Sequence, residues 1–426
     1  MGLNCVVMRR RSFLTAAVGL GVVGGGNLVG RGRPSAGLAD PYAAIDAAAA
    51  RRVFRRDLFP EPVVVASAEL LRLDDTFLVR VRSTDGAEGI GVCNNYQMAS
   101  LVSVYLERIG DFPVGRDVSD LEAFQEAVYL HRSNYKYQGL AFWTAYAPLE
   151  LALLDMLGRI ANRPLHELVG KRVHNHIDVY QANNNRGRTA EESLEAILKN
   201  QEVTGARAVK FKIGGRMSNP EVPATRTERL IPMVAAAFDN DVQLYADANG
   251  SYDVPEALRI GRLLEAHGID LYEAPVRFDD FEGLAEVARA LNIPVAEGEQ
   301  EASQQNFRYL LGRGGLSIIQ PDLFYYGGLI RATRVARMAA AAGATVVPHL
   351  SGAGFGVPYM LHQVAVLPNA GPYHEFKALN PDAIPFECPS VDLRPVAGRL
   401  PVPTGPGSGL NIDPAYVRRH IRVTSC

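Results

Sequence analysis

Cysteine is scarce in this sequence, and no block of charge of one sign is present. The 426 residues include four cysteines, and no pair has the CxxC spacing of zinc or redox sites, which argues against a disulfide framework or a zinc cluster. The 44 basic side chains nearly balance the 46 acidic ones and are scattered, so no long-range field attracts nucleic acid or an anionic membrane. The expected partner is therefore a small molecule.

Long apolar runs are also lacking beyond the N-terminus, so we expect a mature protein that does not enter the membrane. Hydrophobic residues make up 47% of the chain and charged residues 21%, which excludes intrinsic disorder and collagen-like repeats and allows a large core. The length predicts two or three domains, although an α/β barrel of about 250 residues counts as one.

The first forty residues have the layout of an export signal. Arg10 and Arg11 precede Ser-Phe-Leu and a run of small and apolar residues too short to span a bilayer. This arrangement resembles a twin-arginine signal, the route for proteins already folded around a cofactor. We therefore expect an exported, periplasmic protein. The alternative is a disordered basic tail on a cytoplasmic protein.

The rest of the chain divides into an α+β segment and a series of βα units. An Asp-Gly turn at 85–86 between alternating β-branched segments predicts a hairpin, and the apolar spacing from 119 to 169 is helical. After residue 176, short apolar runs alternate with helical segments, which is typical of a parallel α/β barrel. The predicted strand cores are 177–181, 207–212, 243–247, 270–274, 294–298, 316–320, 345–349 and 371–375.

Five segments follow from these patterns. The predicted boundaries are 1–40 for the signal, 41–61 for a linker, 62–175 for an α+β domain, 176–378 for the barrel and 379–426 for a C-terminal return over the surface.

Three carboxylates stand where predicted strands stop, and their spacing repeats. Asp247, Glu273 and Glu299 follow one another at intervals of 26 residues. The carboxyl ends of barrel strands face one mouth, so these side chains are expected at equal depth. Oxygen ligands without nearby cysteine favour Mg2+ over zinc. Taken singly, each carboxylate would more often be a helix cap or a surface charge, and the metal site is favoured because the three occur together at matched strand ends.

Two sets of bases are predicted at the same mouth. Lys210 and Lys212 occupy i and i+2 of a strand and so share a face. A lysine near a cation and a second lysine has its neutral form favoured, as a general base requires. His349 ends a later strand, and Asp322 ends the strand before it, where a carboxylate can fix the tautomer of the imidazole.

These parts permit a narrow range of chemistry. A proton α to a carboxylate is very weakly acidic, and its removal requires a divalent metal to stabilise the enediolate. Bases on opposite faces allow either enantiomer of a substrate to be deprotonated.

In these motifs the chain resembles the enolase superfamily, mandelate racemase subgroup, from about residue 62 onward. The resemblance implies a modified TIM barrel of the (β/α)7β type with an N-terminal α+β capping domain, on which the return segment packs. It also implies the following roles: Asp247, Glu273 and Glu299 as Mg2+ ligands, Lys212 and the His349/Asp322 pair as acid/base groups, Lys210 and Glu375 at the substrate carboxylate, and Asn249 at substrate or metal-bound oxygens. A general picture of a Lys or His base with Mg2+ is established for this superfamily.

In this family, specificity resides in capping-domain loops, which correspond to residues 68–76 and 93–100. Asn94, Asn95 and Tyr96 are candidate contacts to sugar hydroxyls, with a simple turn as the equal alternative. The polar insertion 216–229 lengthens the connection between Lys212 and Asp247 and is expected to reshape the rim.

The sequence is compatible with three functions. The first is dehydration of an acid sugar to a 2-keto-3-deoxy acid, the second is racemisation or epimerisation of a 2-hydroxy acid, and the third is binding of a sugar acid without turnover. The first two use the same residues. The family resemblance also implies a homo-oligomer.

Overall fold

The computed structural model describes residues 40–133, 135–239, 241–351, 354, 356–377 and 393–424. The predicted signal, up to residue 39, and residues 378–392 of the barrel end and return segment lie outside the described residues.

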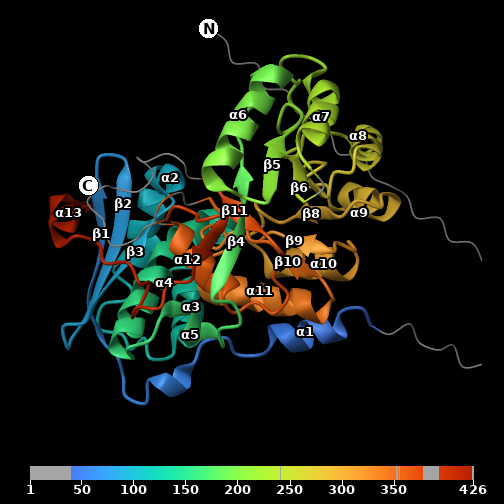
Figure 1. Cartoon of the computed structure of the whole chain (residues 1–426). Coiled ribbons are helices and arrows are strands. Elements are labelled where there is room, and N and C mark those ends of the chain that lie inside the picture. The colour runs from blue at the N-terminus through green and yellow to red at the C-terminus, as the bar shows by residue number, and fades with distance from the viewer. Residues whose placement is uncertain are drawn as a thin grey trace, which may run out of the picture. The chain divides into compact units, whose positions relative to one another are not determined.

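A parallel barrel forms the larger part of the fold, as the sequence predicts. Its strands run in the order β10-β9-β8-β7-β6-β5-β4-β11, and Val346 bridges to Ala370 just before β11 on the remaining side. Figure 1 shows helices α6 to α11 around these strands. The strands are β4 (His176–Ala182), β5 (Ala208–Lys212), β6 (Gln243–Asp247), β7 (Leu271–Glu273), β8 (Val295–Glu297), β9 (Ile318–Ile319), β10 (Thr345–Val346) and β11 (His374–Phe376). The helices are α6 (Ala190–Thr204), α7 (Arg226–Ala237), α8 (Val254–Ala266), α9 (Phe281–Ala290), α10 (Gln304–Gly312), α11 (Leu329–Ala341) and α12 (Gly356–Val364).

The inside of the barrel has an apolar layer below a charged one. Ala208, Tyr245 and Leu271 belong to a small buried cluster within the strands. Side chains two residues further along a strand share its face, so the next inward layer holds Lys210 and its counterparts on β6 and β7. Parallel pairing places Lys212 opposite Asp247 and Asp247 opposite Glu273. The pairing of the strands therefore places the side chains of Lys212, Asp247 and Glu273 at the same depth in the barrel.

The capping domain is an antiparallel sheet covered by helices. Gly89 and Gly91 let β3 approach the backbone of α4, because an added Cβ would lie 2.2 Å from Ala152 O and 2.0 Å from Pro148 O. Its sheet has the order β13-β1-β2-β3. The elements are β1 (Val65–Leu73), β2 (Thr76–Ser83), β3 (Glu88–Val92), α2 (Asn95–Tyr105), a π-helical turn (Leu106–Gly110), α3 (Leu121–Leu130), a 3-10 turn (Tyr135–Tyr137), α4 (Leu140–Ile160) and α5 (Leu165–Val169).

The predicted hairpin at 85–86 joins β2 to β3, but the loop predicted at 68–76 is not a loop. Most of it is the second half of β1, paired with β2 across the two-residue turn at 74–75. The family resemblance placed a loop here, but residues 70 and 71 are buried in the capping core as part of β1.

No segment after the N-terminus was expected to be long and apolar enough to cross a membrane, but helix α4 is. It has the length and apolarity of a membrane span, but 89% of its most apolar window is buried inside the fold. Its apolar surface is therefore accounted for by packing against the capping sheet.

The segment 41–61, expected to be a linker, is folded onto the barrel. It contains α1 (Ala43–Ala49) and a 3-10 turn (Arg56–Leu58), and it buries Ile45 and Phe54. Asp46 pairs with Arg308 of α10 at 2.6 Å. The far end of the chain adds β12 (Arg399–Pro401), which pairs with β4, then α13 (Pro414–Arg419) and β13 (Ile421–Arg422), which pairs with β1.

Candidate active site

The three predicted carboxylates meet at the mouth of the barrel. Asp247, Glu273 and Glu299 each offer an oxygen within 4.8 Å of the others, and all three are buried. Buried like charges at this distance repel each other unless a cation or proton lies among them. Three carboxylate oxygens are a donor set for a hard divalent cation, and the described residues place no thiol or imidazole in the set. The residues present therefore fit Mg2+.

Lys210 is an internal counter-charge for this group. Its Nζ lies 2.8 Å from Glu273 Oε1 and 3.1 Å from Glu375 Oε1, and the side chain is fully buried. Burial lowers the pKa of Lys210, but the carboxylates of Glu273 and Glu375 outweigh it and hold the pKa well above its usual value. Lys210 is therefore an ammonium group at neutral pH, which leaves Lys212 as the candidate base of the pair.

Lys212 occupies a different environment two residues further along β5. It forms a short ion pair with Asp247, lines the cavity described below and is 14% exposed, whereas Lys210 has no exposed surface. Of the two lysines, Lys212 is thus the one that can meet a substrate atom.

His349 and Asp322 form the predicted pair. His349 Nδ1 lies 2.7 Å from Asp322 Oδ2, an oxygen that also accepts a 2.7 Å bond from Ser351 N. Burial and the charge of Lys377 lower the pKa of His349, but neighbouring carboxylates, led by Glu299, outweigh them and raise it. With Nδ1 held by Asp322, the Nε2 atom is the one available for proton transfer.

Glu375 and Glu273 differ in charge state because their neighbours differ. Burial raises the pKa of Glu375, but the ammonium groups of Lys210 and Lys377 overcome it and hold the pKa well below its usual range. For Glu273, burial and the adjacent charge of Asp247 raise the pKa to about 7. Glu375 is therefore a carboxylate at neutral pH, while Glu273 shares its site with a proton unless a cation is present.

Asn249 is held beside the triad by several contacts. Its backbone N donates to Asp247 Oδ1 at 2.8 Å, and its Nδ2 donates to Glu299 Oε1 at 3.2 Å. Its φ of +45° is in the left-handed region, which asparagine tolerates better than most residues. Arg186 Nη1 donates to Asn249 Oδ1 at 2.7 Å. Asn249 therefore helps to position the carboxylates of Asp247 and Glu299. It also lines the cavity, where a substrate could contact it.

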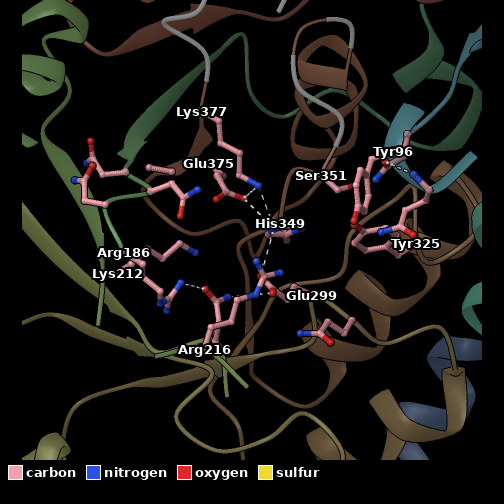
Figure 2. Close-up of a pocket in the computed structure, with 18 of the residues that line it drawn as sticks. Tyr96, Arg186, Lys212, Arg216, Glu299, Tyr325, His349, Ser351, Glu375 and Lys377 are labelled. Atoms are coloured by element: carbon pink, nitrogen blue, oxygen red, sulfur yellow. Dashed lines mark hydrogen bonds and ion pairs between the residues drawn. The ribbon is translucent and has the colours of Figure 1, made fainter. Parts of the chain in front are cut away.

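A cavity of about 1250 Å³ opens over these groups. Figure 2 shows Arg186, Lys212 and Arg216 on one side, Tyr96 and Tyr325 on the other, and His349 between them. Asn94 and the 85% exposed Tyr96 line the cavity. Asn95 does not, because its Oδ1 accepts a bond from Phe77 N of β2. Asn94 also caps α2 by accepting a bond from Gln97 N.

Three polar residues at this mouth were missed by the sequence argument. Arg186 follows β4 and spans to Asn249, Gln320 donates to Glu273 Oε2 at 2.8 Å, and Lys377 Nζ lies 3.2 Å from His349 Nε2. A signal existed for Lys377, which stands at i+2 from Glu375 as Lys212 does from Lys210. Arg186 lies in a run of polar residues directly after β4, at the same end of the barrel as the other site residues, and this position could have indicated it.

Comparison with known proteins gives two family matches that together cover most of the chain. Residues 50–170 match the mandelate racemase / muconate lactonizing enzyme N-terminal domain, and residues 192–416 match the enolase C-terminal domain-like family.

Individual relatives span the chain at moderate identity. An L-rhamnonate dehydratase from Saccharopolyspora erythraea is 29% identical over 84% of this chain and 88% of its own length. An L-talarate/galactarate dehydratase from Salmonella typhimurium is 28% identical over 71% of this chain and 73% of its own length. The solved mandelate racemase/muconate lactonizing protein from Paracoccus denitrificans PD1222, complexed with magnesium, has a TM-score of 0.79 at 25% identity and covers 85% of this chain and 99% of that one.

Proposed function

Because this chain belongs to the mandelate racemase and muconate lactonizing enzyme family of the enolase superfamily, we propose that it is a Mg2+-dependent acid sugar dehydratase. The observation that carries the proposal is one cavity in which Lys212, at the end of β5, and His349, just after β10, both border a buried carboxylate triad. Both curated relatives described above are named as dehydratases of acid sugars.

The triad would hold Mg2+ through Asp247, Glu273 and Glu299. When bound there, Mg2+ supplies positive charge that makes the α-proton of a carboxylate acidic enough to remove. Lys210, a buried ammonium group 2.8 Å from Glu273, adds positive charge beside the triad.

Lys212 is the proposed base for the α-proton. It is the more exposed of the two strand lysines, and its contact with Asp247 holds Nζ at the floor of the cavity. His349 is the proposed acid that protonates the departing β-hydroxyl, with Asp322 fixing the ring so that Nε2 faces the cavity. The product of losing water is an enol that rearranges to a 2-keto-3-deoxy acid.

A racemase or epimerase of a 2-hydroxy acid is the second candidate, because two bases in one cavity also allow a proton to leave one face of a carbon and return to the other. A binding protein without turnover has no need for Lys212 together with the His349/Asp322 pair.

One experiment separates these functions. Purified protein with Mg2+ is incubated with a library of acid sugars and 2-hydroxy acids in deuterated water, and products are followed by NMR. A 2-keto-3-deoxy product supports the dehydratase, and α-deuterium exchange without keto acid supports the racemase. Turnover that survives in His349→Asn would contradict the proposed acid. No turnover of any acid in the library would contradict both enzyme proposals.

We also propose export by the twin-arginine route, on the sequence of residues 10–14. Cell fractionation tests it: the double variant Arg10→Lys/Arg11→Lys is expected to accumulate in the cytoplasm. Equal periplasmic amounts of both forms would contradict the twin-arginine route, and a cytoplasmic location of the unchanged protein would contradict export itself.

A further inference from the structure

Basic side chains outnumber acidic ones on the walls of the cavity. The acidic lining residues are Glu299 and Glu375, which the proposed chemistry already uses. The basic lining residues are Arg186, Arg188, Lys199, Lys212, Arg216 and Lys377. The excess is larger than one substrate carboxylate requires.

Most of these cations near the floor have partners within the protein. Lys212 pairs with Asp247, and Lys377 lies 3.6 Å from Glu375 Oε2. Arg186 donates to backbone oxygens, among them Ile213 O at 2.9 Å and Asp247 O at 3.1 Å. These cations already have partners within the protein and are not free to take a second anion.

Arg188, Lys199 and Arg216 are the remaining lining cations. In the part of the chain that the structure describes, none of the three has a carboxylate oxygen within 4.0 Å of its side-chain nitrogens, and Arg216 is the one fixed beside Asn249. Arg216 also lies close enough to Arg186 that its charge adds to burial in lowering the pKa of Arg186. Two guanidinium groups on one cavity wall repel each other, and an anion placed beside Arg216 relieves this repulsion.

The loop that carries Arg216 is fixed to the site. Arg216, Met217 and Ser218 have φ values of +70°, +51° and +60°, an unusual run for residues other than glycine. Hydrogen bonds hold this turn: Arg216 N donates to Ser251 Oγ at 2.8 Å, and Met217 N donates to Asn249 O at 2.9 Å. The turn thus anchors Arg216 to the same loop that carries Asn249.

We propose that Arg216 binds a second anionic group of the substrate. This inference rests on the proposed function and narrows its substrate to acid sugars charged at both ends, one end at the triad and the other at the β5–α7 loop. A guanidinium forms bidentate hydrogen bonds with either a carboxylate or a phosphate. Either group could therefore be the second anionic group of the substrate, at the end away from the triad.

The test compares matched substrates. A stereochemical panel of hexarates, which carry two carboxylates, is assayed against the hexonates of the same configurations, which carry one, and against the 6-phosphohexonates. We expect kcat/KM at least tenfold higher for one of the doubly charged series. The series that is preferred tells whether the second group is a carboxylate or a phosphate.

Variants assign the preference to the named residue. Arg216→Gln is expected to lower the ratio of kcat/KM for doubly to singly charged substrates at least tenfold, and Arg216→Lys is expected to lower it less. The control is Arg207→Gln, a 70% exposed arginine at the opposite end of β5. Thermal unfolding is measured for each variant, so that a folding defect is recognised.

Failure of this inference is distinguishable from failure of the proposed function. Turnover of hexonates as fast as of both doubly charged series, or a ratio unchanged by Arg216→Gln, would overturn the second anion site and leave the dehydratase intact. Absence of turnover throughout the panel, with and without Mg2+, would count against the dehydratase itself.

Discussion

The Nδ1 atom of His349 lies 2.7 Å from Oδ2 of Asp322, although the two residues end different strands of the barrel. The same Asp322 side chain accepts backbone bonds from Phe324 N and Ser351 N, so it is fixed on both sides. Asp322 therefore acts on the orientation and tautomer of the imidazole.

Replacing this carboxylate is expected to damage turnover more than substrate binding. Asp322→Asn keeps the size of the side chain but loses the charge that stabilises a protonated imidazole, and a fall in kcat of roughly 100-fold or more follows from the scale of general acid catalysis. Steady-state kinetics measure it, with the exposed Asp279→Asn as control. An equal rise in KM at unchanged kcat would show that Asp322 serves binding only.

Glu273→Gln is expected to lower both activity and Mg2+ affinity. The amide removes one of three negative charges and leaves Lys210 without its nearest carboxylate. We expect Mg2+ affinity to fall about 100-fold or more, above the 10- to 100-fold effect of losing a supporting contact to a ligand. Calorimetric titration with Mg2+ measures it, and Glu286→Gln on the outer helix α9 is the control. Activity that persists after chelator treatment would refute the metal site.

Binding of Mg2+ is expected to weaken as the pH falls. Burial and the charge of Asp247 raise the pKa of Glu273 to about 7, and only the deprotonated carboxylate binds the cation. Below pH 7 a proton therefore competes with Mg2+, and the dissociation constant should rise about tenfold for each pH unit. Titrations between pH 5.5 and 8 test this, and a pH-independent constant would contradict the assignment.

A buried histidine pair is expected to make the fold acid-sensitive. His166 Nδ1 lies 3.0 Å from His362 Nδ1, and His362 Nε2 lies 3.0 Å from Ser408 O. Burial lowers the pKa of His166 to about 4 and that of His362 to about 3. Because both values are depressed below about 6.5, the unfolded chain binds more protons, and stability is complete above pH 6.5 and lost as the pH falls toward 4.

The expected loss is about 1.4 kcal/mol of unfolding free energy per pH unit for each histidine. Denaturant unfolding at several pH values from 4.5 to 7 measures the slope. The variant His166→Gln should show a smaller slope, since one titrating group is gone. A slope that is the same in both proteins would assign the acid sensitivity to other groups.

The barrel and its charged mouth could be predicted because they depend on periodicity. Strand lengths, the i and i+2 spacing of Lys210 and Lys212 and the equal intervals between carboxylates are all visible along the chain. Parallel pairing then converts equal position in each strand into equal depth, as the register of Lys212, Asp247 and Glu273 shows.

Other features depend on contacts that no local pattern reveals. Asn95 has the sequence pattern of a surface polar residue, but its side-chain oxygen accepts a bond from Phe77 N near the start of β2. The sequence predicts helix across α4 but no run of spanning length, because polar residues such as Glu150 interrupt it. In the fold Glu150 is buried and accepts a 2.8 Å bond from Gln125. The charge state of Lys210 could not be read from its lysine neighbour because the carboxylates around it come from distant strands.

Strand β13 closes the capping sheet by pairing Arg422 with Leu71 and Ile421 with Arg72. Synthesis of the chain proceeds from the N-terminus, so β1 is made long before its partner β13. Until β13 is made, the nascent protein presents an open strand edge, the kind of surface that pairs with a neighbouring chain and seeds aggregation. Strand β13 therefore covers the edge of β1, and a variant that lacks Ile421 and Arg422 should give a lower yield of folded protein even though these residues lie outside the cavity.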